Sequence, residues 1–243
     1  MARVNCLKIM LWLSILQFRS LIDGKRLYPS DYVKYLGILI DPHLNWSHQT
    51  DALSTRLSRG VGMLAKIKHF VPKDTLRTIY YAIFSSLLTY GCQVWGQFNN
   101  KYIGRIERLQ NKAIKIINFA NNNDSVTPLY HQSNILKLSD HIKLLNFTFV
   151  HDCVNNNLPI SLKGTFQLAN SVHSHNTRGA SRFKIKVPKT NTIVYGIKSI
   201  TYQSIEFWNS LVTKFHKKNL HTQSKAVCKK IIKQYFIDGY TMG

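Results

Sequence analysis

The stretch that decides the fold is KDTLRTIYYAIFSSLLTYG, residues 73–91. Its apolar residues cover most of the circumference of a helix, and such a helix is normally a buried one. Pro72 stands just before the stretch, and Gly91 is a suitable C-terminal stop because glycine accepts the left-handed conformation found there. The stretch therefore predicts a buried helix within a helical bundle.

Helical patterns continue on both sides of this stretch. Residues 47–70 place apolar side chains every three or four positions along one side, which predicts an amphipathic helix; these are Leu53, Leu57, Val61, Leu64 and Ile67. Further helices are expected over 99–119, 133–156, 200–217 and 222–237, with a polar linker at 121–128 and strand signals within 158–199.

The first 41 residues predict a small β unit. Two strand-like stretches, 9–19 and 32–41, flank a turn signal at Asp23 and Gly24. Gly37 lies inside the second stretch, YVKYLGILID, where glycine marks a bulge or the close approach of a ligand. The apolar run at 9–16 is too short to span a bilayer and has no signal-peptide cleavage pattern after it, so we expect a buried strand.

The predicted fold is therefore mainly α, with a small N-terminal β-hairpin. We expect a β-hairpin in residues 1–41, a helical bundle in 42–120, and an α-rich region with short strands in 121–243.

The charge of the chain is far from balanced. Lys and Arg number 33 and Asp and Glu 11, so the formal net charge is +22. Such an excess destabilises a compact chain by self-repulsion unless a polyanion is near. Nucleic acid is the expected partner; the alternatives are an anionic membrane surface and a merely solvated basic surface.

Residues 99–119 concentrate this charge on one side of the expected helix. At 100° per residue, five basic residues fall within an arc of about 80°, opposite the apolar side. Like charges spaced in this way destabilise a helix, and the only acid, Glu107, lies off the row. The row therefore predicts phosphate binding, with a solvated face as the alternative; its members are Lys101, Arg105, Arg108, Lys112 and Lys115.

Basic residues recur on other expected elements, which is typical of a surface that follows a nucleic-acid backbone. The additional candidates for phosphate contact are Arg56, Arg59 and Lys66 on the first helix and Arg182, Lys184 and Lys186 in an alternating stretch. A further row at helical spacing consists of Lys225, Lys229 and Lys233.

Catalytic and metal-binding patterns are not found. The eleven acids are scattered, whereas two-metal phosphoryl chemistry needs clustered carboxylates. His173 with His175, and His141 with His151 and Cys153, lack a recognised zinc spacing. We therefore expect no metal or other cofactor in this chain. The four cysteines are far apart, which favours a reducing, intracellular compartment, nuclear or cytoplasmic.

Several short motifs together resemble one family. They are Lys34-Tyr35-Leu36-Gly37, Asp41, Trp46, Tyr90-Gly91, Trp95-Gly96, RIERLQNKAIKIIN (105–118), HSHNTR (173–178) and FWNSL (207–211). In this order they resemble the region after the polymerase palm in reverse transcriptases of non-LTR (LINE-type, jockey-like) retrotransposons. The resemblance covers roughly residues 20–215, and it is specific only as an ensemble.

The resemblance implies a role as well as a fold. It implies a primer grip that carries Tyr35 and Gly37, a helical thumb, and an RNA or DNA primer–template as partner, with no membrane partner. The catalytic aspartates of the family lie in the palm and are not matched in this chain, so Mg²⁺ would belong to that missing domain. We therefore expect nucleic-acid binding without polymerisation. A host-retained module that binds RNA or protein is the alternative, and a secreted basic protein a weaker one.

Overall fold

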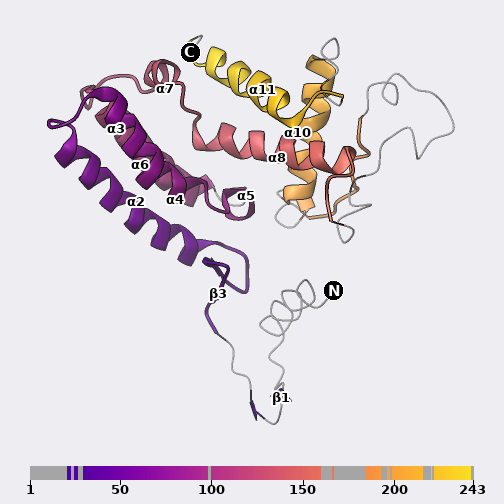
Figure 1. Cartoon of the computed structure of the whole chain (residues 1–243). Helices are drawn as coiled ribbons and strands as arrows, with labels where there is room; N and C mark the ends of the chain where they lie inside the picture. Colours follow the sequence, from indigo (N-terminus) through magenta and orange to yellow (C-terminus); the bar gives the residue numbers. More distant parts are fainter. Residues whose placement is uncertain are drawn as a thin grey trace.

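The computed structural model describes residues 21–22, 25–26, 30–97, 100–159, 166, 184–192, 196–197, 199–215, 220 and 222–241. Helices dominate this part of the chain and form two groups joined by α8 (Leu138–Val154). One group contains α2 (Ser47–Ile67), α3 (Lys73–Ile79), α4 (Ser86–Thr89) and α6 (Asn100–Ile117); the other contains α10 (Ile200–Lys214) and α11 (Lys225–Gly239). Figure 1 shows α8 running across the middle, between the purple helices and the yellow α11. The mainly helical fold is as the sequence predicts.

The stretch 73–91 forms one helical run that contains a π-helical segment, η1 (Tyr80–Ser85), between α3 and α4. Leu76, Tyr80, Phe84 and Leu88 follow one another at i,i+4 and are all buried. The rings of Tyr80 and Phe84 stack with their centroids 5.4 Å apart. Gly91 has a φ of 61°, so the predicted stop is confirmed.

The prediction that this helical run is buried holds for one side only. α2 and α6 contact the run, α8 contacts its last part α4, and the remaining side is exposed. Tyr81 is 41% exposed, and Thr78, Ala82 and Ser86 are exposed as well. Apolar residues around most of a helix therefore overstate its burial where neighbours cover only one side.

α2 and α6 pack against each other and so position the basic row. α2 contributes Leu53, Leu57 and Leu64 to the core, and α6 contributes Ile106 and Ala113. Since both helices are anchored by an apolar side, the opposite side of each is held toward solvent.

The region expected as a linker followed by one helix contains two helices. α7 (Thr127–Ser133) begins with a proline in its first turn, a position that suits proline because the missing N–H has no partner there. It ends at Asn134, whose φ of 54° is left-handed. The chain then reaches Lys137 before α8 begins, so the predicted helix 133–156 starts about one turn too early.

The last two helices are close to their predicted ranges. Ser199 caps α10 by accepting the N–H of Tyr202, and Ser224 caps α11 by accepting that of Val227. Aromatic stacking joins α8 to α10, with the rings of Phe147 and Trp208 4.9 Å apart. Within 158–199, the described residues include a β-bridge at Ile185, whose backbone N–H and C=O both bond the side chain of Asn209.

The N-terminal β structure differs from the prediction. Residues 32–41 are not one strand: β3 (Val33–Tyr35) and β4 (Ile38–Ile40) pair with each other in an antiparallel hairpin. Residues 21–22 and 25–26 form a second short hairpin, β1–β2, across the predicted Asp23–Gly24 turn. The expected strand at 9–19 lies outside the described residues.

Candidate nucleic-acid interface

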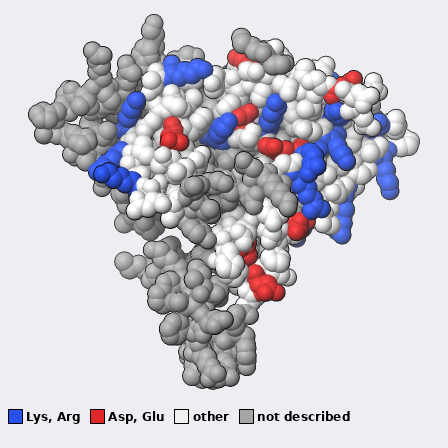
Figure 2. All heavy atoms as spheres, turned by 180° about the vertical axis from the view of Figure 1, so that it is seen from behind, with Lys and Arg blue, Asp and Glu red and all other residues white. Residues whose placement is uncertain are grey.

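The basic row lies on the solvent side of α6. Arg105, Arg108 and Lys112 are exposed, and Lys115 is half-buried. The side chain of Lys101 lies outside the described residues. Figure 2 shows several Lys and Arg side chains on the side of the molecule where the N-terminal helices lie, with acidic side chains among them, and further Lys and Arg on the opposite side.

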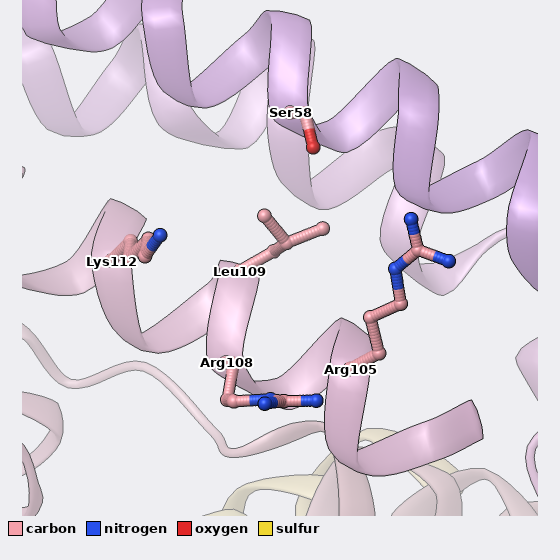
Figure 3. A pocket seen from close by; sticks show the side chains of 5 residues that line it. All are labelled: Ser58, Arg105, Arg108, Leu109 and Lys112. Carbon is pink, nitrogen blue, oxygen red and sulfur yellow. The ribbon is translucent and has the colours of Figure 1, made fainter. Parts of the chain in front are cut away.

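A shallow groove of about 290 Å³ lies where this row meets α2, and we name it the α2–α6 groove. Arg105 extends across it toward α2, and Leu109 lies between the two helices (Figure 3). Arg108 lies along its own helix and donates its Nε–H to the Gly104 carbonyl at 3.2 Å. The groove combines cations, an apolar contact and a hydroxyl; its lining residues are Ser58, Arg105, Arg108, Leu109 and Lys112.

One cation of the row has an acidic partner that its own helix does not supply. Arg105 pairs with Asp51 of α2 at 2.8 Å, which corrects the expectation that no acid relieves the row. The two side chains are 56% and 61% exposed, so the pair stabilises the fold by only about 0.2–1 kcal/mol. Lys115 donates to the Asn122 carbonyl at 2.5 Å, and this neutral acceptor leaves its charge uncompensated.

The structure does not bring the basic residues of α2 into the groove. Arg56, Arg59 and Lys66 are all exposed, and none lines it. At 100° per residue, Arg56 lies about 160° around α2 from Ser58, which faces the groove. A contact from Arg56 would therefore belong to a different surface from that of the α6 row.

Gly37 lies in the tight turn of the β3–β4 hairpin, so the prediction of a glycine inside a strand is wrong. Leu36 and Gly37 have φ values of 47° and 82°, the pattern of a two-residue hairpin turn with both central residues left-handed. A Cβ on Gly37 would lie 3.6 Å from the ring of Tyr90. The group close to this glycine is thus a side chain of the same protein.

The hairpin is tied to the helices by residues of the family-like motifs. Tyr90 donates its hydroxyl to the Leu36 carbonyl at 2.5 Å, and Gln49 accepts the Leu39 N–H. The buried carboxylate of Asp41 accepts the N–H groups of Asn45 and Trp46 at 2.8 and 2.6 Å. These contacts place the half-buried Tyr35 and the exposed hairpin tip beside the start of α2.

A second basic cluster joins three helices. Burial lowers the pKa of Lys233 on α11, and Arg77 of α3 lowers it further. Burial also lowers the pKa of His141 on α8, and the positive charges of Lys229 and Lys233 lower it further. Sequence spacing identifies the two lysines, but Arg77 and His141 are too distant in sequence to be grouped with them.

The other predicted basic residues are dispersed. Lys184 is half-buried and Lys186 exposed, on either side of the buried Ile185, while Arg182 lies outside the described residues. Lys225 pairs with Asp152 of α8 and so serves the packing of α11.

The described part of the chain contains neither a metal-binding cluster nor a helix that could span a membrane. No group of three His, Cys, Asp or Glu side chains there could hold a metal ion, and His141, His151 and Cys153 do not form one. His173 and His175 lie outside this part. No helix in it is long and apolar enough to cross a membrane.

Comparison with known proteins identifies a relative. The chain is 34% identical over 87 residues to a protein described as "Probable RNA-directed DNA polymerase from transposon X-element" of Drosophila melanogaster. The match covers 35% of this chain and 10% of that protein, so the chain spans about a tenth of the relative's length. No family model matches the chain, and no solved structure matches it. The similarity supports a relationship to transposon-encoded RNA-directed DNA polymerases.

Proposed function

We propose, starting from the relationship to a transposon RNA-directed DNA polymerase, that this chain binds the primer–template of such an enzyme. Residues 42–120, which include α2, α3, α4 and α6, act as a thumb, and the β3–β4 hairpin acts as the primer grip. The observation that carries the proposal is the row Arg105, Arg108, Lys112 and Lys115 on the solvent side of α6, opposite its buried side.

The length of the row suits a nucleic-acid strand. Arg105 and Lys115 are ten residues apart, which at 1.5 Å per residue is about 15 Å along the helix. Successive phosphates of one strand are separated by about 3.4 Å along a duplex axis, so the row can follow roughly four nucleotide steps. Contacts of this kind position a duplex and carry no base information, so binding is independent of sequence.

The described acids support a binding role rather than a catalytic one. Asp41 caps the loop before α2, Asp51 pairs with Arg105, and Asp152 pairs with Lys225. Asp140 accepts hydrogen bonds from Lys143 and Tyr240. These carboxylates serve structural contacts, and no group of three possible metal ligands occurs in the described part of the chain, so we infer that Mg²⁺ would be held by a palm domain.

The test replaces the three exposed cations of the α2–α6 groove, Arg105, Arg108 and Lys112, with glutamine, which keeps helix propensity and removes charge. Binding to an RNA–DNA hybrid duplex is measured by fluorescence anisotropy over a range of salt concentrations. The slope of log K against log salt should become shallower by about 2.7, at about 0.9 per phosphate contact.

The matched control removes three charges elsewhere, by replacing the exposed Lys189, Lys214 and Lys230 with glutamine. If both triple variants lose the same affinity and slope, net charge alone explains binding and the proposed surface is wrong. Circular dichroism establishes that each variant is folded.

A further inference from the structure

The ion pair between Asp51 and Arg105 stands at the edge of the surface proposed for phosphate contact. Asp51 and Ser58 are seven residues apart, so they lie within about 20° of each other around α2 and share the edge that faces α6. Arg105 reaches across to this edge (Figure 3). The same guanidinium thus lines the α2–α6 groove and binds an acid at its border.

A phosphate that binds Arg105 competes with Asp51 or is repelled by it. If Arg105 turns to the phosphate, the ion pair is lost; if it stays, the carboxylate remains close to a second anion. Both side chains are more than half exposed, so water and salt weaken the ion pair. An arginine–phosphate contact is charge-assisted and can be bidentate, so it is strong enough to displace such a pair.

We propose that Asp51 is an internal competitor for the nucleic-acid phosphate, which weakens the contact at Arg105 so that it can be exchanged. This role rests on the proposed nucleic-acid binding, and it makes Asp51 a residue that lowers the affinity. A polymerase thumb must release and rebind phosphates as the duplex advances. The nearby carboxylate of Asp51 lowers the free-energy cost of each release, because it gives Arg105 another anionic partner.

The central test is Asp51→Asn in the full chain, measured on an RNA–DNA hybrid duplex near 0.1 M salt. We expect binding to tighten about 1.4- to 5-fold, the range that corresponds to an exposed ion pair. Because the effect concerns release, stopped-flow measurements should show a slower dissociation rate with a nearly unchanged association rate.

Asp74→Asn is the matched control, because it removes the same charge from an exposed position in the first turn of α3. It should change affinity less than Asp51→Asn, since long-range effects are screened at this salt concentration. Arg105→Gln provides a second check. In that background, Asp51→Asn should tighten binding no more than Asp74→Asn does, because Asp51 acts on binding through the guanidinium of Arg105.

The possible outcomes separate the two proposals. Equal effects of Asp51→Asn and Asp74→Asn, or an Asp51→Asn effect that persists without Arg105, would overturn the competitor role and leave nucleic-acid binding intact. Binding by Asp51→Asn but not by the wild-type chain would support both. If no variant and no wild-type protein binds the hybrid, both proposals fail.

Discussion

Single residues in unusual conformations shape the hairpin that lies beside α2. Leu36 is 73% exposed and has a φ of 47°, which costs an ordinary L-residue about 1–2 kcal/mol. Asparagine accepts this conformation far better and is preferred at the first central position of such a turn. The Tyr90 hydroxyl bonds the backbone carbonyl of Leu36, so a new side chain leaves that contact intact.

Leu36→Asn should therefore raise the free energy of unfolding by about 0.5–1 kcal/mol, since it relieves a left-handed strain at the loss of little buried surface. Urea denaturation followed by circular dichroism measures the change. Gly37→Val is the opposite control: its φ of 82° is strained for a branched residue, so this variant should destabilise the hairpin. An unchanged midpoint for both variants would show that the turn conformation is energetically unimportant.

Among the elements, α11 is held to α8 at both ends. Lys225 pairs with Asp152 near the start of α11, and the buried Tyr240 follows its end. The Tyr240 hydroxyl donates to Asp140 at 2.7 Å and accepts the Lys137 N–H at 3.1 Å. Burial, together with the hydrogen bond to Asp140, raises the pKa of Tyr240 above its usual value.

Tyr240→Phe should lower the free energy of unfolding by about 1–3 kcal/mol at neutral pH, because it leaves a buried acceptor and a backbone donor unpaired. The raised pKa predicts a second effect. Unfolded tyrosine ionises near pH 10 while the folded group stays protonated, so its contribution to stability is present below about pH 10 and is lost as the pH rises further.

The variant should therefore lose less stability than the wild type when the pH is raised above 10. Thermal melts at a series of pH values test this, with Tyr235→Phe as a control on the same helix. Parallel pH profiles for the wild type and Tyr240→Phe would contradict the raised pKa of Tyr240 as the cause of the stability loss above pH 10.

For the whole molecule, the proposed function predicts nucleic-acid binding without polymerisation. We expect the purified chain not to extend a primer on an RNA template with Mg²⁺ or Mn²⁺, because no group of three carboxylate, His or Cys side chains in its described part could hold a metal ion. A primer-extension assay against a mock preparation is the measurement. Incorporation that disappears on replacement of an acid of this chain would contradict the expectation.

The sequence by itself determined the helices and the basic row. Both depend on spacing along one helix: the apolar side of α6 and its cations follow from positions three and four residues apart, and the structure has them on opposite sides. Helix ends were predicted less well, because Asn134 ends α7 through a left-handed conformation that apolar periodicity does not report.

Only the tertiary structure decided which groups meet. Asp51 and Arg105 are 54 residues apart, as are Leu36 and Tyr90, and no local pattern links them. Gly37 was misassigned because a two-residue turn between two short strands has the same apolar and β-branched composition as one strand. Periodicity indicates on which side of its own helix or strand a residue lies. Which residues meet across elements depends on how α2, α6 and the hairpin pack.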